Sequence, residues 1–483
     1  MSATAAAPAR RFAPIPTIDG LWALIAVVVP VAGAFASRIM AIDLAYQIRA
    51  GNVMLDTHRI LDADTFTYTV HGRPWLNQQW GSEVLLALIH RAGGWTGIAL
   101  ARGLLLGLTV FLVYRSCRQY VAPRTAALLT LAGWLVGIEI LPALRPQQFG
   151  FVLFAATLWA VTTRHHSPRR VWLVPLFMVA WANLHGSFPL GLVLLGLAWL
   201  EDRPSAPLAA RRLLLVAGVA VVATFVDPWG PRVWSYVVQL STDPVVADHI
   251  AEWGPPSVHS PTGLLFFLSM FAVALLLSRA PRPIGWLPLC TLGLFAGLGL
   301  LAIRGVVWWA MVAPVVVARL LPDPQEGRQE ARQRPPLHAL LAVGLVALLV
   351  VTLPFGRGTD PLTGGPAVLT YAPEHLVAAA RAAAPAGAHT FVSQLYASWA
   401  ELATPGSLVA VDSRIEIFPE TVWDDYYLVS AGGEGWAEVL DRWDVAVLIL
   451  EPAQAEGLLQ VIGRHPEWRL ITDDAAGAVY ARA

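Results

Sequence analysis

Runs of about 20 apolar residues recur along most of this 483-residue chain, and this repetition limits its fold more than any other feature. A helix of about 20 residues is what the hydrocarbon core of a bilayer requires, so each run is a candidate membrane span. At 56% hydrophobic and 14% charged residues, with a mean hydropathy of +0.57, the chain is too apolar for a soluble protein of this length. The sequence therefore predicts a polytopic α-helical membrane protein.

The apolar runs and the Arg-bearing loops between them indicate about eleven spans, the first over 21–40 and the last over 337–354. The basic loops alternate along the chain, and the positive-inside rule assigns them to the cytoplasm. We therefore expect a cytoplasmic tail over 1–20, a membrane domain over 21–354 with an outer loop over 41–94, and an extracytoplasmic domain over 355–483.

The N-terminus also permits a second interpretation. Basic residues, an apolar stretch and Ala34-Phe35-Ala36 would suit a cleavable signal peptide, with a mature chain that starts near Ser37. We prefer an uncleaved anchor because the run is long enough to span. The expected orientation is the same in both cases.

The outer loop reads as structure that lies on the membrane surface. Residues 43–55 and 80–91 can each form a short interfacial helix, and 65–70 between them alternate as a strand does. Trp75 and Gln79 belong to a group of aromatic and amide side chains that could bind sugar. For Trp75 an interfacial aromatic belt is an equal alternative.

Asp43 directly follows the first apolar run. A carboxylate at the bilayer edge shares a plane with the head group of a lipid-borne substrate, so it can act as a general base there. The alternative is that Asp43 caps an interfacial helix beginning at Leu44. The neighbouring polar and aromatic residues favour the catalytic interpretation.

Further polar residues fall in turns on the same side as this loop. Arg145 and Arg304 occupy short turns, and a guanidinium there suits a phosphate because it donates two parallel, charge-assisted bonds. His185 lies in a tight hairpin and Glu252 in a longer loop. Salt bridges between helix ends are an equally weighted alternative for any single one of these residues.

The tail from about residue 356 differs in character from the rest. Its apolar runs shorten to strand length and alternate with helix-like segments, which predicts a small α/β domain with an at least partly parallel sheet. Asp412 and Arg414 follow a predicted strand, and a structural ion pair is the preferred interpretation for them. The tail has no phosphate loop, zinc pattern or nucleophile elbow.

The chain resembles a known superfamily. An acidic residue after the first span, two interfacial helices, many spans and an outer domain are together similar to the GT-C membrane glycosyltransferases, which include the protein mannosyltransferases and the arabinose and aminoarabinose transferases. The segments DLAYQIRAGN, ADTFTYT, GRPWLNQQW, LRPQ, WANLHGSFPLG and AEWGPP are similar to a bacterial set of GT-C-like proteins.

The resemblance implies a polyprenyl-phosphate sugar as donor and transfer with inversion on the extracytoplasmic face of the bacterial cell (inner) membrane. Asp43 matches the first-loop acid of the superfamily, and Asp64, in a D-x-D triplet, is the second candidate for catalysis. Arg145 and Arg304 would stabilise the departing phosphate. The residues expected to line the cavity and bind the acceptor are Trp75, Gln79, His185 and Glu252.

We expect no cofactor. Some superfamily members use a divalent metal, but the acidic residues here lack the spacing that would indicate one. Besides the lipid donor and the bilayer, the expected partner is a glycan, lipid or protein acceptor, and the absence of a basic tail argues against nucleic acid. Two alternatives stay open. One is a transporter or flippase, although the lack of an internal repeat argues against it. The other is a non-catalytic binder of a lipid-linked glycan.

Overall fold

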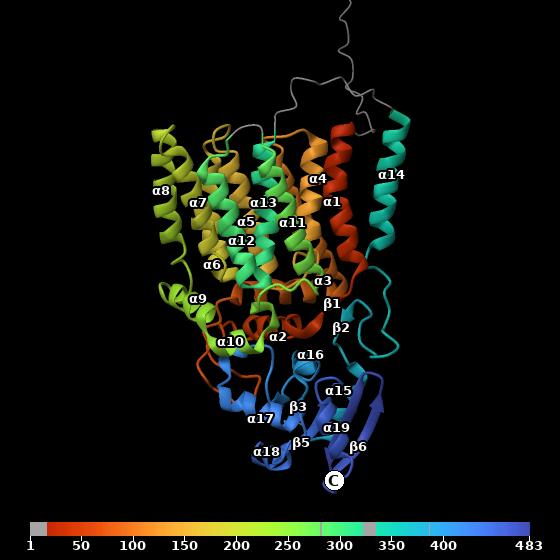
Figure 1. The fold of residues 1–483 in the computed structure, drawn as a ribbon. Coiled ribbons are helices and arrows are strands. Elements are labelled where there is room, and N and C mark those ends of the chain that lie inside the picture. Colours follow the sequence, from red (N-terminus) through yellow and green to blue (C-terminus); the bar gives the residue numbers. More distant parts are fainter. Residues whose placement is uncertain (1–16, 281–282, 322–334, 386) are drawn as a thin grey trace, which may run out of the picture.

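The computed structural model describes residues 17–280, 283–321, 335–385 and 387–483. Most of the expected tail over 1–20 lies outside these residues. Figure 1 shows a region of helices that run side by side and, at one end of it, an α/β domain that contains the C-terminus. Between them lies a layer of shorter helices, which we call the junction layer.

The helical region contains the apolar runs. Its helices are α1 (Ile18–Ala36), α3 (Trp80–Cys117), α4 (Pro123–Val136), α5 (Pro146–Thr162), α6 (Val174–Leu184), α7 (Pro189–Asp202), α8 (Pro207–Ala223), α11 (Pro261–Ser278), α12 (Trp286–Leu301), α13 (Val306–Leu320) and α14 (Pro335–Thr352). Many start with proline at the first or second position, where its fixed φ suits a helix and its missing N–H costs nothing.

The expected number of spans is not confirmed. Among the described residues, four helices are long and apolar enough to cross a membrane: Ile18–Ala36, Trp80–Cys117, Pro261–Ser278 and Ile303–Leu320. Three shorter apolar helices cover Arg170–Leu184, Trp286–Leu301 and Pro336–Thr352. Apolar side chains such as Leu104 and Val351 are exposed on this region, as a lipid-facing surface requires.

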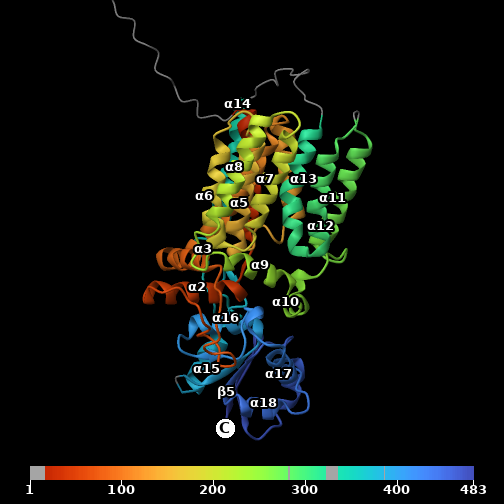
Figure 2. The ribbon, with the colours of Figure 1, turned by 90° about the vertical axis from the view of Figure 1, so that its left-hand side faces the viewer.

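The junction layer consists of α2 (Ala41–Thr57), the first part of α3, α9 (Arg232–Thr242), α10 (Pro244–His249) and the 3₁₀ turn η2 (Ala251–Trp253). Figures 1 and 2 show α2 lying across the end of the helical region. The expected interfacial helix over 43–55 is therefore present and begins two residues earlier. The expected first span over 21–40 ends at Ala36, because Ile39 and Met40 form strand β1 instead.

The second interfacial helix is joined to a long helix at Gly94. This residue has φ 55° and ψ −152° inside α3, a conformation that glycine adopts without steric cost. The chain thereby changes direction between the segment that starts at Trp80 and the apolar remainder of α3. The kink separates the segment 80–91 from the long apolar helix, as expected, and its position on the membrane surface stays a prediction.

The α/β domain contains a five-stranded sheet in the order β4-β3-β5-β7-β6. Strands β4 (Leu408–Val409), β3 (His389–Val392) and β5 (Val445–Leu450) pair in parallel, whereas β7 (Gly477–Arg482) is antiparallel to both β5 and β6 (Trp468–Asp474). The expected partly parallel sheet is therefore present. The domain's helices are α15 (Glu374–Ala383), α16 (Gln394–Ala403), α17 (Glu420–Ser430), α18 (Trp436–Arg442) and α19 (Glu456–Ile462), with the 3₁₀ turn η5 at Ile415–Ile417.

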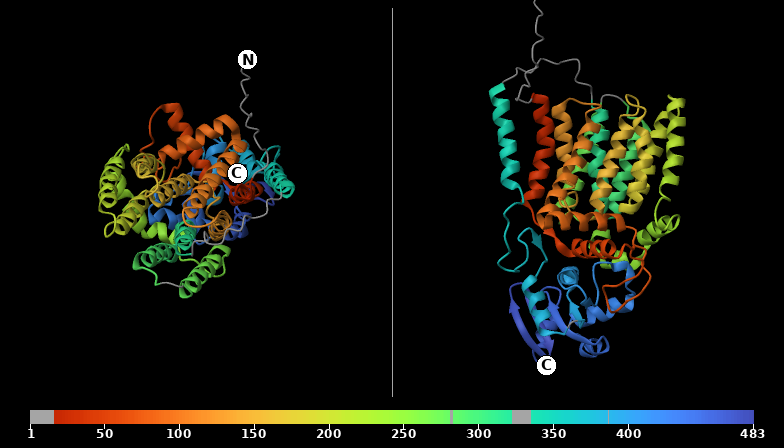
Figure 3. Two further views of the ribbon diagram at one scale, coloured as in Figure 1. Left: turned by 90° about the horizontal axis from the view of Figure 1, so that it is seen from above. Right: turned by 180° about the vertical axis from the view of Figure 1, so that it is seen from behind.

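The α/β domain packs against the junction layer, as the view from behind in Figure 3 shows. Strand β2 (Leu369–Thr370) pairs in parallel with β1, and one apolar core contains Leu44 and Ile48 of α2 together with Tyr396 and Ala397 of α16. The strand expected over 65–70 does not form. This segment makes only an isolated bridge from Thr67 to Val409 because it crosses the edge of the domain at β4.

Candidate functional site

An arginine between two carboxylates lies where the junction layer meets the helical region. Asp43 is in the first turn of α2, and its Oδ2 lies 2.9 Å from Nε of Arg145, while Nη1 of Arg145 lies 2.9 Å from Oε1 of Glu252. The helix starts at Ala41 with Met40 as its N-cap, so Asp43 does not cap it and the capping alternative is wrong. Oδ1 of Asp43 makes no hydrogen bond to any described residue, so it is available to a substrate.

Arg145 holds this cluster together from the residue before α5. Burial alone would lower the pKa of its guanidinium, but the charges of Asp43 and Glu252 outweigh burial and raise it. The side chains remain partly accessible, with 18% of Arg145, 22% of Asp43 and 41% of Glu252 exposed. Both carboxylates therefore face an aqueous space.

Arg304 lines a cavity of about 160 Å³ beside this cluster. Its guanidinium lies 4.4 Å from the ring centre of Trp253, the residue after Glu252, and forms no ion pair with a described carboxylate. The two arginines thus differ in their ion pairs. Arg145 is neutralised by two acids, whereas the guanidinium of Arg304 lines the cavity without such a pair among the described residues. The other residues that line the cavity include Gln78, Gln79, Gln147, His185, Ser187, Tyr236, Ser241 and Trp308.

His185 presents a hydrogen-bond donor to this cavity. Its Nδ1 accepts from the backbone N–H of Ser187 at 3.2 Å and lies 2.8 Å from the Ser187 hydroxyl. The neutral ring then carries its proton on Nε2. Burial and the neighbouring charge of Arg304 lower the pKa of His185 to about 3, so the ring is neutral at physiological pH.

Three buried polar side chains, Gln47, Asn77 and Glu83, belong to α2 and to the segment that follows it. Asn77 donates to Oε2 of Glu83 at 2.6 Å, while Oε1 of Glu83, Oδ1 of Asn77 and Oε1 of Gln47 have no partner among the described residues. Burial raises the pKa of Tyr46, and the charges of Glu83, Asp43 and Glu416 raise it further. Buried oxygens without partners suit water or a polar ligand.

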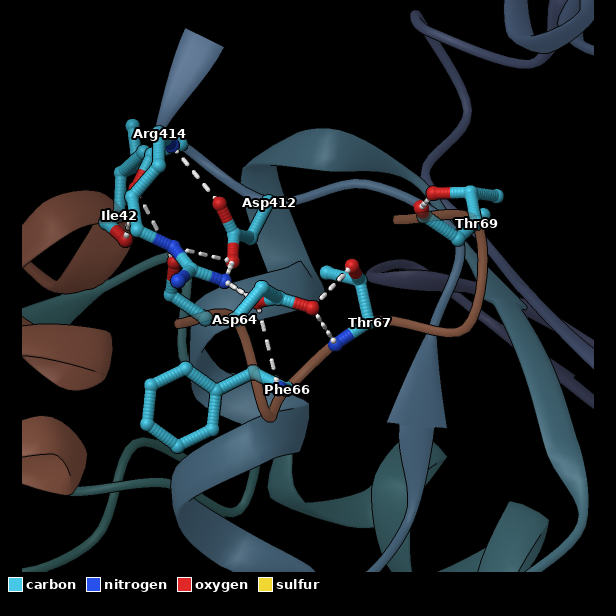
Figure 4. A network of polar contacts seen from close by, with 10 residues as sticks. Ile42, Asp64, Phe66, Thr67, Thr69, Asp412 and Arg414 are labelled. Atoms are coloured by element: carbon cyan, nitrogen blue, oxygen red, sulfur yellow. Dashed lines mark hydrogen bonds and ion pairs between the residues drawn. The ribbon is translucent and has the colours of Figure 1, made fainter. Parts of the chain in front are cut away.

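Asp64, the second catalytic candidate, lies elsewhere. It is fully buried and accepts from the amide and hydroxyl of Thr67, and its Oδ1 lies 2.5 Å from Nη2 of Arg414 (Figure 4). Arg414 also donates to Asp412 through its backbone N–H and through Nε at 2.8 Å. The ion pair expected between Asp412 and Arg414 is thus confirmed, and Asp64 joins it from the outer loop.

The remaining candidates divide between two sides of α9. Gln79 and His185 line the 160 Å³ cavity, whereas Trp75 lies under Arg414, whose guanidinium is 4.8 Å from the Trp75 ring centre, and borders a second cavity. Tyr236 and Glu416 were not among the site residues predicted from the sequence. Tyr236 lies on an amphipathic helix too short to span, a signal for an interfacial position that could have been used.

Among the described residues, no three or more His, Cys, Asp or Glu side chains are grouped so as to hold a metal ion. Asp43 and Glu252 are both engaged by Arg145. Metal dependence therefore stays a prediction.

Solved structures with the same architecture exist, although no protein-family model and no curated protein matches the sequence. The archaeal oligosaccharyltransferase AglB from Archaeoglobus fulgidus, in complex with an inhibitory peptide and a dolichol-phosphate, superposes with a TM-score of 0.55 at 13% identity. The match covers 96% of this chain and 74% of AglB.

Two further transferases match over nearly the whole of this chain. The arabinofuranosyltransferase AftD from Mycobacteria has a TM-score of 0.57 at 15% identity, covering 97% of this chain and 40% of AftD. ArnT from Cupriavidus metallidurans, bound to undecaprenyl phosphate, has a TM-score of 0.53 at 14% identity and is covered to 97%, with 96% of this chain matched. At these identities the likeness shows the fold, and the chain has the fold of the GT-C membrane glycosyltransferases.

Proposed function

We propose that the protein transfers a sugar from a polyprenyl-phosphate donor to an acceptor hydroxyl, with inversion, at the extracytoplasmic face of the bacterial inner membrane. The observation that carries this proposal is the placement of Asp43 and Arg304. Among the described residues, one oxygen of Asp43 accepts no hydrogen bond and Arg304 has no ionic partner. The cluster that contains Asp43 adjoins the polar cavity that Arg304 lines, at the level where helices give way to the α/β domain. The fold shared with AglB and ArnT, which were solved with polyprenyl phosphates, supports the choice of donor.

The chemistry follows from these two groups. The acceptor oxygen attacks the anomeric carbon while Asp43 takes up the hydroxyl proton, and the bond from the anomeric carbon to the phosphate oxygen breaks. The leaving phosphate keeps the electron pair, and Arg304 stabilises the charge that develops on it. Arg145 holds Asp43 by one carboxylate oxygen, which orients the other. Asp64 has no part in these steps because it is buried against Arg414.

The test is sugar transfer from a synthetic polyprenyl-phosphate sugar by the full chain in liposomes. Wild type should release polyprenyl phosphate in an acceptor-dependent reaction, and Arg304→Ala should release far less. Arg59→Ala, which removes an exposed arginine that lines neither the 160 Å³ cavity nor the 510 Å³ cavity, is the matched control for loss of positive charge. Donor that binds without ever being consumed would favour the non-catalytic binder, and donor moved intact across the bilayer would favour the flippase.

The side of the membrane is tested independently. The α/β domain and α2 lie at the same end of the helices, so they share one compartment (Figure 1). A phosphatase reporter fused after Ala483 should be active, because it requires the extracytoplasmic space. Activity of a cytoplasm-only reporter at the same position would overturn the proposed orientation.

A further inference from the structure

A second, larger cavity also borders α9. It has a volume of about 510 Å³ and lies between the outer loop, α9 and the α/β domain. Pockets that hold organic ligands span about 300 to 1,000 Å³, so this cavity can take a ligand of several rings. We call it the outer groove. Its walls come from three distant parts of the sequence, and it therefore exists only in the folded chain.

The outer groove combines charges of both signs. Asp62, Asp243 and Glu416 bring carboxylates to it, and Arg73 and Arg232 bring guanidiniums. None of these five side chains forms an ion pair with another charged residue in the part of the chain that the structure describes. Asp243 accepts from the backbone N–H of Val245 and Glu416 accepts from the Tyr236 hydroxyl, and each carboxylate keeps further acceptor positions, so the groove offers a ligand both acceptors and donors.

Aromatic and neutral polar groups complete the walls. The indoles of Trp75 and Trp229 line the groove, as do the amide of Gln239 and the hydroxyls of Ser235 and Tyr236. An indole offers an apolar face next to polar groups, the surface on which the C–H face of a sugar ring can lie. The hydroxyls at the edge of such a ring both donate and accept, so carboxylates and guanidiniums can each bind them.

Other ligand classes fit this lining less well. Because the lining carries both signs of charge, a ligand with a single sign of charge is repelled by part of it, and the charged walls are unsuited to an acyl chain. A neutral polyhydroxyl ligand meets none of these costs. The composition of the walls therefore selects carbohydrate.

The two cavities adjoin along one helix. Tyr236 and Leu240 of α9 line both, and the Tyr236 hydroxyl lies 3.3 Å from Oε1 of Glu416 in the outer groove. A ligand in the outer groove would thus end beside the cavity assigned to the donor. We infer that the outer groove binds a neutral oligosaccharide as the acceptor. The role of this ligand as acceptor rests on the proposed function, whereas its chemical class is inferred from the groove itself.

The test is binding of neutral oligosaccharides to the full chain in nanodiscs without donor. The probes are di- to tetrasaccharides of glucose, galactose, mannose and arabinose, with tetragalacturonic acid and the peptide Asn-Ala-Thr as other classes, all measured by saturation-transfer NMR. At least one neutral oligosaccharide should bind. Trp229→Ala and Glu416→Gln should each weaken it by about tenfold or more, since each removes a direct contact.

Controls match the variants in residue type. Glu420→Gln alters an exposed acid close to Glu416, and Trp172→Ala removes an exposed indole, and neither residue lines the groove. Both should bind as wild type does. Binding of only the peptide or only the polyanion, no binding by any probe, or groove variants that bind normally would each overturn the inference. Because no donor is present, oligosaccharide binding without any transfer activity would contradict the proposed function alone.

Discussion

Two clusters in this molecule share one composition and differ in burial. In each, an arginine lies between two acids, and one of the two acids comes from the expected outer loop over 41–94. The clusters are Asp43 and Glu252 around Arg145, and Asp64 and Asp412 around Arg414. Around Arg145 the side chains are 18 to 41% exposed, whereas around Arg414 they are at most 1% exposed. The comparison shows that two clusters of the same residue types differ in accessibility, and only the one around Arg145 is open to a ligand from solvent.

The buried cluster is enclosed on all sides. The guanidinium of Arg414 lies 4.8 Å from the ring centre of Trp75 and 5.0 Å from that of Phe66. These aromatic side chains exclude water, so the pairing with Asp64 and Asp412 is strong only while every partner is present. The outer loop is thereby fixed to the α/β domain, and the outer groove depends on that contact.

The largest expected effect is on folding, from Arg414→Ala. Removing the cation leaves Asp64 and Asp412 buried without a counter-charge, which costs about 3 to 5 kcal/mol. Folded protein recovered by size-exclusion chromatography should fall steeply, with a lower melting temperature. Arg442→Ala, which removes an exposed arginine of the same domain, is the control. A stable Arg414→Ala protein would show that the buried cluster does not hold the domain.

The sharpest contrast comes from the same change made in both clusters. Asp43→Asn should lower transfer by about 10²-fold or more, because it removes the proton acceptor, and should leave the amount of folded protein nearly unchanged. Asp64→Asn should do the opposite and lower the melting temperature, because a buried charge pair is broken. Transfer assays and thermal melts of the two variants measure this directly. Equal turnover by Asp43→Asn and wild type would eliminate Asp43 as the base.

Arg145 of the exposed cluster and Arg304 on the adjoining cavity are expected to differ in their effects. Arg304→Ala should weaken binding of polyprenyl phosphate by about tenfold, since a charge-assisted hydrogen bond contributes about 1.5 to 3 kcal/mol. Arg145→Ala should weaken that binding less and reduce turnover more, because Asp43 loses its orienting partner. Titration with fluorescent polyprenyl phosphate and single-turnover kinetics separate the two effects. Equal effects of both variants on both measurements would show that the arginines act together on the phosphate.

The smallest expected effect is a pH dependence of the buried cluster. Glu401 is buried near Asp412 with both carboxylate oxygens unpartnered among the described residues, and burial followed by the charge of Asp412 raises its pKa well above the usual value. Its protonated form is therefore the one that the fold accommodates, and the stability it contributes is present at low pH and lost as pH rises through the raised pKa. Glu401→Gln, which mimics the protonated acid, should melt as wild type does at pH 5 and at a higher temperature at pH 9. Parallel pH profiles would contradict this assignment.

Sequence reasoning gave a good account of elements that depend on local pattern. The interfacial helices over 43–55 and 80–91, the apolar runs and the partly parallel sheet were all predicted, because hydrophobic periodicity and chain punctuation act over short distances. The wrong predictions arose because local pattern carries no information about contacts with distant segments. The first span was drawn to residue 40, and a strand was expected over 65–70, because nothing in either segment shows that β2 and β4, more than 300 residues later, lie beside them.

The sequence by itself determined the class of this protein, the position of Asp43 shortly after the first apolar helix and the presence of polar residues in the turns that follow. Only the tertiary structure decided which of those residues meet. It placed Arg145 against Asp43, directed Arg304 at a cavity and buried Asp64 with Arg414, a residue 350 positions away. The reason is physical: a carboxylate's chemistry depends on the charges and water within a few ångströms of it, and those neighbours come from segments that local pattern cannot relate.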